Sequence, residues 1–225
     1  MMDIQGFTLT AKQEEAFRVY YERLIEKNQV MNLTAITDYE EVLVKHFEDS
    51  LMLLKYDGDF STLIDVGTGA GFPGLPLAIM KPDTEVLLLD SLQKRIGFLD
   101  EVIRLTGLKN AITEHNRAED GAKAHREAFD RAVSRAVANL STLAEYCLPF
   151  VKVGGYFAAY KSGNVEEEVK AAEKAIRILG GKLQRVETYS LSNGDPRSLV
   201  FIQKVAPTPK KYPRKAGTPQ KMPLK

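Results

Sequence analysis

Hydrophobic positions recur with a helical period in the first quarter of the chain. In the stretch AKQEEAFRVYYERLIEKNQ, the residues at the three- and four-residue spacing of one helix face are Ala16, Val19, Tyr20 and Leu24. A second apolar stripe of this kind runs through EVLVKHFEDSLMLLKY, and Thr37 and Glu40 ahead of it have the spacing of a capping box. The pattern therefore predicts a helical region over residues 1–57.

Residues 61–161 alternate short β-rich runs with helical patterns. The expected strands are TLIDVG, TEVLLLD, NAITEHN, FDRAVSRAV and GGYFAAYK. Between the second and the third, LQKRIGFLDEVIRLTG is amphipathic and ends at Gly107, the residue type that commonly terminates a helix. Regular alternation of strands and helices is typical of a mostly parallel sheet with helices on both faces.

Residues 164–205 add one charged helix, NVEEEVKAAEKAIRILGG, and then two strand-like runs, KLQRVETYSL and SLVFIQKV. The turn-rich sequence SNGDPR joins these runs, so we expect them to pair as an antiparallel hairpin. The predicted fold class is α/β and Rossmann-like. Its mostly parallel sheet ends in the antiparallel hairpin and carries an N-terminal helical extension.

The last 19 residues differ in composition from the rest of the chain. They hold six lysines and arginines, no acid and five of the ten prolines, whereas the preceding residues hold 25 basic and 30 acidic side chains. Such a segment is expected to be extended, either as a solvated end or as an arm that contacts phosphates. We divide the chain into a helical region packed on the main domain (1–57), the main α/β domain (58–205) and a basic, proline-rich arm (206–225).

The overall composition is that of an ordinary globular protein, with 44% hydrophobic and 27% charged residues. No apolar run approaches the roughly 18 residues that a membrane span needs, and the N-terminus has no signal-peptide pattern. The single cysteine, Cys147, cannot form an internal disulfide. We therefore expect a cytoplasmic protein with no membrane or metal partner.

The stretch DVGTGAGFPG follows the first expected strand, and its part from Gly69 to Gly74 matches G-x-G-x-x-G. In such sheets a ligand lies at the carboxyl ends of the strands, beside this turn. A pyrophosphate would need free backbone N–H groups at the start of the next helix. Pro73 and Pro76 each remove one such donor, and Asp65 would repel a phosphate. These residues favour a ligand with a cationic amine and no pyrophosphate.

Asp90 ends the second expected strand, 21 residues after Gly69. An acid at this place accepts hydrogen bonds from ribose hydroxyls. Together with Gly67, Gly69 and Gly71 of the loop, it indicates S-adenosylmethionine, which has an adenosine and an amino-acid part but no pyrophosphate. Two alternatives stay open, namely an NAD-type oxidoreductase and a non-catalytic ribosome- or RNA-binding module with a methyltransferase-like fold.

Six motifs occur in order and at compatible spacing, namely MNLTAI, KHFEDSL, DVGTGAGFPGLPLA, LLDSLQKRIGFL, FDRAVSRAVANL and YPRKAGTPQKMPL. From about residue 28 to the C-terminus the chain resembles the glucose-inhibited division protein B family, also called ribosomal RNA small-subunit methyltransferase G. The resemblance implies a class I methyltransferase that uses S-adenosylmethionine. It also implies methylation of N7 of one guanine in a conserved 16S rRNA loop near the decoding site. The expected partner is 16S rRNA or the small ribosomal subunit, and we expect a monomer.

Carried over onto this sequence, the resemblance implies that the cofactor contacts Gly67, Phe72, Ala118, Glu119 and Arg135. Guanine N7 has a free lone pair, so the reaction needs no strong general base and can proceed mainly by positioning. The methylated ring becomes cationic, and a nearby carboxylate would stabilise it. Asp49 is the candidate for this role. His46, three residues earlier on the same helix edge, is the second catalytic candidate.

An RNA substrate must be held by a chain whose first 206 residues are net acidic, so phosphate contacts are expected from local basic patches. Lys161 at a strand end and Arg197 in the late turn are two candidates. The others lie in the tail and are Lys210, Lys211, Arg214 and Lys215. On this view, truncation after Val205 should retain cofactor binding and abolish RNA methylation.

Overall fold

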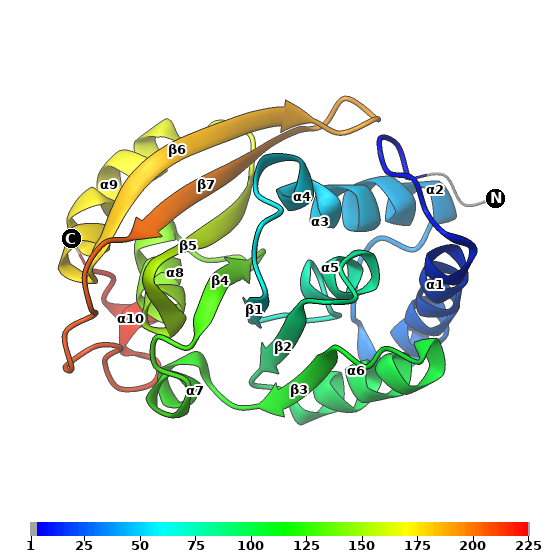
Figure 1. The fold of residues 1–225 in the computed structure, drawn as a ribbon, viewed down its shortest axis with the longest axis horizontal. Coiled ribbons are helices and arrows are strands. Elements are labelled where there is room, and N and C mark those ends of the chain that lie inside the picture. Colours follow the sequence, from blue (N-terminus) through cyan, green and yellow to red (C-terminus); the bar gives the residue numbers. More distant parts are fainter. Residues whose placement is uncertain (1–3, 225) are drawn as a thin grey trace.

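The computed structural model describes residues 4–224 and centres on one seven-stranded sheet (Figure 1). Its strands are β1 (Thr62–Val66), β2 (Glu85–Asp90), β3 (Ala111–His115), β4 (Phe129–Ser134), β5 (Val151–Ser162), β6 (Gly181–Ser190) and β7 (Pro196–Lys204). They lie in the order β3-β2-β1-β4-β5-β7-β6. Strands β1 to β5 run parallel, and β7 is antiparallel to both β5 and β6. The predicted parallel sheet with a terminal antiparallel hairpin is confirmed.

Helices cover both faces of this sheet (Figure 1). One face carries α1 (Ala11–Met31), α2 (Tyr39–Val42), a π-helical turn (Leu43–Glu48), α3 (Asp49–Leu51), α4 (Leu53–Tyr56), α5 (Gly74–Met80) and α6 (Gln93–Thr106). The other carries α7 (Ala118–Ala124), α8 (Leu140–Cys147), a 3-10 turn (Leu148–Phe150), α9 (Glu166–Ile178) and α10 (Thr218–Lys221). Each face has its own cluster of buried hydrophobic side chains.

Alternate residues of the central strands enter opposite clusters. Leu63 and Leu88 belong to the cluster under α1, α5 and α6, whereas Ile64 and Leu89 belong to the one under α8 and α9. Burial on both faces explains why β2 is a continuous apolar run instead of an alternating one. β1 lies between β2 and β4, so the chain changes its winding direction there. In open α/β sheets the ligand crevice lies at the carboxyl ends of the strands at such a point.

The N-terminal region is helical as predicted, with one difference in detail. α1 buries Tyr20 and Leu24 completely against the sheet cluster. The predicted capping box at Thr37 is wrong, because Asp38 is the N-cap of α2 and its carboxylate accepts a 3.0 Å hydrogen bond from the backbone N–H of Glu41. The π-helical turn then follows, a feature often found at functional sites. It carries side chains toward the crevice described below.

The chain after β7 packs against the domain instead of extending into solvent, so the prediction of an extended arm is wrong. Thr208, Tyr212 and Pro219 are buried, and α10 lies beside α8 (Figure 1). Composition suggested an extended segment because the segment itself contains no acid. Its acidic partner is the fully buried Glu145, which pairs with Arg214 and lies far away in the sequence. The division at residues 57/58 and 205/206 stays a prediction.

Candidate active site

The glycine-rich stretch forms the turn between β1 and α5, and its glycines have two different roles. Gly67 and Gly69 have positive φ angles of 72° and 63° and line cavities at the carboxyl ends of the strands. Gly71 lines neither of the two cavities described below, because it faces the core. A Cβ at Gly71 would lie 2.7 Å from the Tyr20 hydroxyl. Gly71 therefore allows the loop to pack against α1.

Asp65 lies beneath the glycine loop and not at the ligand side of it. Its carboxylate is fully buried and accepts hydrogen bonds from the Thr68 hydroxyl at 2.7 Å and the backbone N–H of Gly74 at 2.8 Å. Burial raises the pKa of this carboxyl to about 6, and the two hydrogen bonds act in the opposite direction. The expectation that Asp65 would repel a bound phosphate is therefore replaced by a structural role. It holds the loop in its turn.

The smaller of two cavities, about 270 Å³, opens at the carboxyl ends of β1, β2 and β4. Four predicted cofactor residues, Gly67, Asp90, Ala118 and Glu119, line it. The Asp90 carboxylate accepts hydrogen bonds from the backbone N–H groups of Gly69 and Leu92, both at 2.9 Å. Asp90 is therefore fixed at the end of β2, at the place predicted for a ribose-binding acid.

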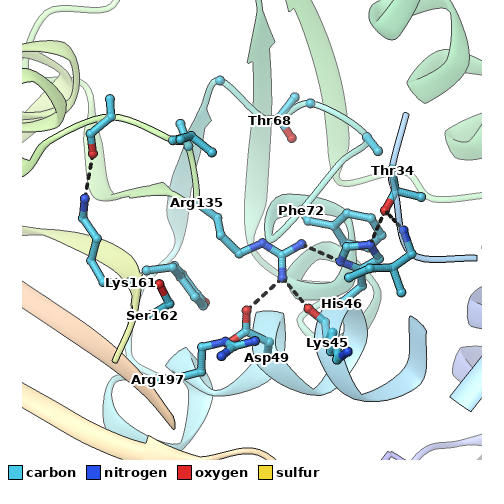
Figure 2. A pocket seen from close by; sticks show the side chains of 18 of the residues that line it. Thr34, Lys45, His46, Asp49, Thr68, Phe72, Arg135, Lys161, Ser162 and Arg197 are labelled. Atoms are coloured by element: carbon cyan, nitrogen blue, oxygen red, sulfur yellow. Dashed lines mark hydrogen bonds and ion pairs between the residues drawn. The ribbon is translucent and has the colours of Figure 1, made fainter. Parts of the chain in front are cut away.

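The larger cavity, about 800 Å³, lies on the other side of the glycine loop (Figure 2). Its wall combines the π-helical turn and α3, the glycine loop, and the carboxyl end of β5. Charged side chains line it from these elements, from the segment after β4, from the start of β7 and from α9. Those side chains are Lys45, Asp49, Arg135, Lys161, Glu168 and Arg197. Figure 2 shows five of them.

Arg135 is the centre of the larger cavity's hydrogen-bond network (Figure 2). Its guanidinium donates to the backbone carbonyl of Lys45 at 3.1 Å, to Oδ2 of Asp49 at 2.9 Å and to Nδ1 of His46 at 3.2 Å. Its Cζ also lies 5.0 Å from the centroid of the Phe72 ring. A largely buried arginine is costly unless it is paired, and Arg135 both has these partners and lines the cavity.

His46 is held as a neutral ring by its surroundings. Because arginine can only donate, Nδ1 accepts from Arg135 and the ring proton is on Nε2, which lies 2.8 Å from the Thr34 hydroxyl oxygen. Burial, together with the charge of Arg135, lowers the pKa of His46 to about 3. A ring that stays neutral and is bound on both sides is suited to positioning Arg135 and unsuited to proton transfer at neutral pH.

Asp49 lies at the floor of the larger cavity with only 3% of its surface exposed. Besides the bond from Arg135, it accepts a 2.9 Å hydrogen bond from the Tyr189 hydroxyl. The Arg197 guanidinium lies 3.8 Å away. One buried carboxylate is thus shared by two arginines, and this geometry leaves the cavity with net positive charge on its wall.

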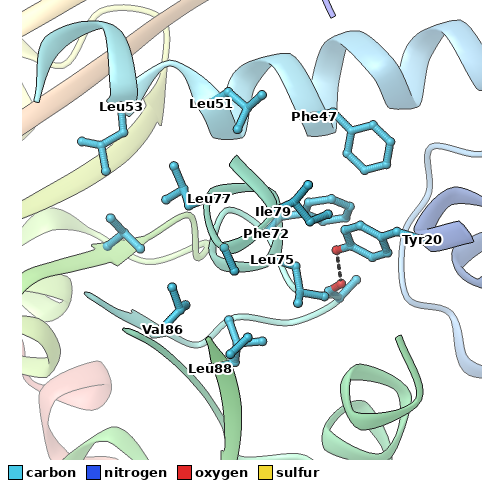
Figure 3. Close-up of a cluster of buried hydrophobic side chains, with 14 of the residues drawn as sticks. Tyr20, Phe47, Leu51, Leu53, Phe72, Leu75, Leu77, Ile79, Val86 and Leu88 are labelled. Carbon is cyan, nitrogen blue, oxygen red and sulfur yellow. Dashed lines mark hydrogen bonds between the residues drawn. The ribbon is translucent and has the colours of Figure 1, made fainter. Parts of the chain in front are cut away.

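Phe72 contributes its ring to the wall of the larger cavity, although only 6% of its surface is exposed. The ring is stacked with His46 at a centroid distance of 4.4 Å and with Tyr20 at 5.2 Å. Tyr20 in turn donates a 2.5 Å hydrogen bond to the carbonyl of Ala70 (Figure 3). These contacts tie the glycine loop to α1 and to the π-helical turn. Phe72 therefore packs in the hydrophobic core and also lines the larger cavity.

The two cavities meet at one place. Gly67 and the segment Ala136–Ala138, which connects β4 to α8, line both of them. Within this segment the Val137 side chain is fully exposed. The Lys161 ammonium donates to the carbonyl of Ala138 at 2.7 Å and so anchors the segment. A ligand that extends from the smaller cavity into the larger one would pass this junction.

The predicted RNA-binding residues occupy two regions. Lys161 and Arg197 lie in the larger cavity, where Lys161 also pairs with Glu168 at 2.6 Å. In the C-terminal segment, Arg214 is committed to its ion pair with Glu145 at 2.7 Å. Of the four predicted contacts in that segment, Lys210, Lys211 and Lys215 are exposed. We therefore keep these three lysines as candidates for RNA contact and give Arg214 a structural role.

Sequence reasoning missed several residues of the site. Lys45 and Tyr189 belong to the larger cavity or its network, and Gly217 and Gln220 line the smaller one. Lys45 directly precedes the predicted His46 on the same turn. The other three reach the site through the packing of elements distant in sequence, so no local signal could have identified them. Among residues 4–224 there is no group of three or more His, Cys, Asp or Glu side chains arranged to hold a metal ion. In the same part of the chain, the helices are too short or too polar to cross a membrane.

The sheet order and the cavities at the carboxyl ends of its strands give the chain the fold of Rossmann-like methyltransferases. Two solved structures that share this fold are P. horikoshii TYW2 in complex with MeSAdo and the 16S rRNA (adenine(1408)-N(1))-methyltransferase from Catenulisporales acidiphilia. The first has a TM-score of 0.58 at 14% identity and covers 72% of this chain and 63% of its own. The second has a TM-score of 0.56 at 15% identity and covers 71% and 93%.

The family follows from sequence similarity. The family model for rRNA small subunit methyltransferase G matches residues 13–199. Proteins of that name from Lachnoclostridium phytofermentans and Clostridium novyi are 57% and 50% identical to this chain. The alignments cover 97% and 95% of this chain and 93% and 90% of the relatives. The chain belongs to the rRNA small subunit methyltransferase G family, and the oxidoreductase alternative is therefore wrong.

Proposed function

We propose that this protein transfers the methyl group of S-adenosylmethionine to N7 of one guanine in 16S rRNA. The observation that carries the proposal is the junction at Gly67 and Ala136–Ala138, which joins a small cavity containing the ribose-binding candidate Asp90 to a large, positively lined cavity. The first cavity suits a nucleoside and the second suits a nucleotide of a polyanion. Family membership supports the same activity.

The residues of the smaller cavity fit S-adenosylmethionine better than a dinucleotide. Among the described residues that line this cavity, Arg117 is the one basic side chain, so the wall offers little for a pyrophosphate. We propose that Asp90, Ala118 and Glu119 hold the adenosine part. Gly67, Gly69, Phe72 and Arg135 then hold the amino-acid part near the junction. When bound, this cofactor supplies a methyl group on a positively charged sulfur.

The side chains of the larger cavity are suited to hold and orient a guanine without removing a proton from it. Guanine N7 has a free lone pair, and His46, whose pKa is lowered to about 3, would not act as a base at neutral pH. The contribution of the protein is therefore positional. The base must leave its stack to enter a cavity, as in other enzymes that act on nucleobases.

Asp49 has an electrostatic role in this proposal. A methylated guanine carries a positive charge, which Arg135 and Arg197 alone would oppose. The buried Asp49 carboxylate lies 2.9 Å from one of these arginines and 3.8 Å from the other, so it offsets part of their charge. It also orients the guanidinium of Arg135. Asp49 and His46 thus act as positioning residues in place of the catalytic roles first considered.

The partner and the cellular location belong to the same proposal. We expect a monomer that acts in the cytoplasm on 16S rRNA or on the small ribosomal subunit. The exposed lysines at positions 210, 211 and 215, together with Lys161 and Arg197 at the larger cavity, supply the basic groups for phosphate contacts.

The test is transfer of a radiolabelled methyl group from S-adenosylmethionine to purified small subunits and to naked 16S rRNA. Substrates are taken from a bacterial strain that lacks its own enzyme of this family. We expect label in at least one of the two, at one guanine that becomes sensitive to borohydride–aniline cleavage. Label at another atom or in protein would contradict the proposal, and so would its absence from both substrates.

A further inference from the structure

The C-terminal segment, Pro207–Leu224, ends at the smaller cavity and not in solvent. Gly217 and Gln220 line this cavity together with Asp90 and Glu119. In Figure 1 the segment leaves β7, passes α7 and reaches α8 through α10. The chain region with the highest density of basic residues therefore contributes to the cavity that we assign to the cofactor.

The first anchor of the segment lies directly after β7. The Lys204 ammonium is completely buried and donates to the carbonyl of Leu148 at 2.6 Å and to the Thr208 hydroxyl at 2.8 Å. Glu127 accepts from the backbone N–H of Thr208 at 2.8 Å and lies 3.1 Å from Lys204. Arg126 adds hydrogen bonds to the carbonyls of Thr208 and Tyr212. These contacts fix the start of the segment.

The second anchor is the pair between Arg214 and Glu145. The Glu145 carboxylate is completely buried and accepts from the Arg214 guanidinium at 2.7 Å and 2.9 Å and from its backbone N–H at 2.8 Å. A buried carboxylate needs such partners, since leaving it unpaired is costly. Glu145 lies on α8, the helix whose residues Thr142 and Leu143 line the smaller cavity. The pair thus joins the segment to the cavity wall.

The third anchor is at the cavity itself. The Glu119 carboxylate, 6% exposed, accepts a 2.8 Å hydrogen bond from the backbone N–H of Gly217. The Thr142 hydroxyl donates to the carbonyl of Pro219 at 3.1 Å. Both Glu119 and Thr142 line the cavity. Glu119, which we assign to the cofactor, is therefore oriented by the segment.

We propose that residues 217–220 form one wall of the cofactor site, with Gln220 as a direct contact to the adenosine part and Gly217 as the group that positions Glu119. This inference rests on the function proposed above. Binding of the cofactor should stabilise the segment. A ligand that contacts the segment only when the segment is packed at the cavity shifts the equilibrium toward this packed state. The expectation that truncation after Val205 would retain cofactor binding is withdrawn.

Hydrogen–deuterium exchange on the full-length protein tests the inference. S-adenosylhomocysteine is the probe, because it contains the same adenosine and cannot react. We expect slower exchange of the amides of residues 214–221 and of the glycine loop when the probe is bound. Protection of the loop with unchanged exchange in residues 214–221 would overturn the inference. If calorimetry detects no binding of the probe, the proposed function fails as well, so the two failures are distinguishable.

A pair of neighbouring substitutions provides the second test. Gln220→Ala removes a side chain that lines the cavity, whereas Lys221→Ala, the control, removes the next exposed side chain, which does not line it. We expect Gln220→Ala to weaken S-adenosylhomocysteine binding about three- to tenfold, as loss of one polar contact does. Lys221→Ala should bind like wild type, and both should keep the wild-type melting temperature. Equal affinities for the two variants would contradict a direct contact from Gln220.

Discussion

The smaller and the larger cavity share a rim at Gly67 but are built in different ways. In the smaller cavity the acids Asp90 and Glu119 are held by backbone N–H groups of Gly69 and Gly217. In the larger cavity Arg135 and its partners hold one another mainly through side chains. Backbone contacts give a rigid site for a constant ligand, whereas a network of charged side chains presents positive charge to a polyanionic substrate. We therefore expect substitutions in the smaller cavity to affect mainly cofactor affinity and those in the larger one to affect mainly turnover. Phe72 and Arg135, which we also assign to the amino-acid part of the cofactor, should affect both.

The largest effect is expected for Arg135→Ala, which removes the centre of the larger cavity's network. Turnover should fall about a hundredfold or more, since one preorganised charged group is typically worth that much. Arg135→Lys should recover only part of the loss, because lysine cannot donate to Lys45, His46 and Asp49 in one plane. The exposed Arg104 on α6 supplies the matched control, Arg104→Ala. Steady-state methylation of small subunits would measure these changes. Wild-type turnover in Arg135→Ala would remove the basis for assigning the two cavities different roles.

Asp90→Ala should mainly change cofactor binding. The substitution removes the proposed acceptor for the ribose hydroxyls and also frees the N–H groups of Gly69 and Leu92. We expect the dissociation constant for S-adenosylmethionine to rise about ten- to a hundredfold, with Asp90→Asn between it and wild type. Titration calorimetry provides the measurement. If Asp90→Ala kept its affinity for S-adenosylmethionine and lost turnover, the smaller cavity would not have the cofactor-binding role that we give it.

The pH dependence of stability tests whether the His46 ring is neutral in the folded protein. Its folded-state pKa of about 3 lies below the unfolded value of about 6.5, so the unfolded chain binds more protons between these values. Its contribution to stability is thus present above about pH 6.5 and is lost as the pH falls toward 3. His46→Asn, whose amide oxygen can still accept from Arg135, should show a smaller loss of melting temperature on acidification. His46→Gln should place its side-chain amide toward Thr34 and retain less turnover than His46→Asn. Identical acid stability of wild type and His46→Asn would show that His46 is not held neutral.

Asp65 should change the stability of the fold with pH in the opposite direction from His46, and over a narrower pH range. Its folded pKa of about 6 lies above the unfolded value of about 4, so the folded chain binds the extra proton. This group therefore stabilises the fold as the pH falls through 6 and partly offsets His46. The melting-temperature curve of His46→Asn, in which only Asp65 of the two still titrates, should rise slightly between pH 7 and pH 5. A monotonic fall over that range would contradict the assignment for Asp65.

The smallest effect is expected for the exposed lysines of the C-terminal segment. Replacing Lys210, Lys211 and Lys215 together by alanine should weaken binding to 16S rRNA and lower its salt dependence, because fewer counterions are released. Binding of S-adenosylhomocysteine should stay unchanged, since none of the three lines the smaller cavity. Filter binding at several salt concentrations would measure the slope. An unchanged slope would remove these residues from the RNA surface.

Strand and helix patterns could be predicted from the sequence because each element carries its own period. The apolar run of β2, the helix ending at Gly107 and the final hairpin are all local signals, and the structure confirms them. The chemical type of the ligand also followed from the sequence, since the glycine loop and Asp90 stand at the ends of two consecutive strands, β1 and β2. These features depend on residues close together in the chain.

Features that depend on distant packing could not be predicted. The role of Gly71 depends on Tyr20 of α1, which packs against it. The role of Asp65 depends on how the loop folds over its carboxylate and brings Thr68 and Gly74 to it. The C-terminal segment was expected to be extended from its composition, and only the buried Glu145 shows why it folds back. His46 and Asp49 were recognised as a pair on one helix edge. Their common partner, Arg135, is almost 90 residues further along the chain.

The proposed reaction is methyl transfer to guanine N7 across the junction of the two cavities. It is tested most directly in a bacterial strain deleted for its own family member and complemented with this gene or with the Arg135→Ala variant. Borohydride–aniline cleavage then maps N7-methylguanine in 16S rRNA. We expect one cleavage site that is absent in the deletion strain, restored by the wild-type gene and strongly reduced with the variant. A cleavage map that the wild-type gene leaves unchanged would contradict it.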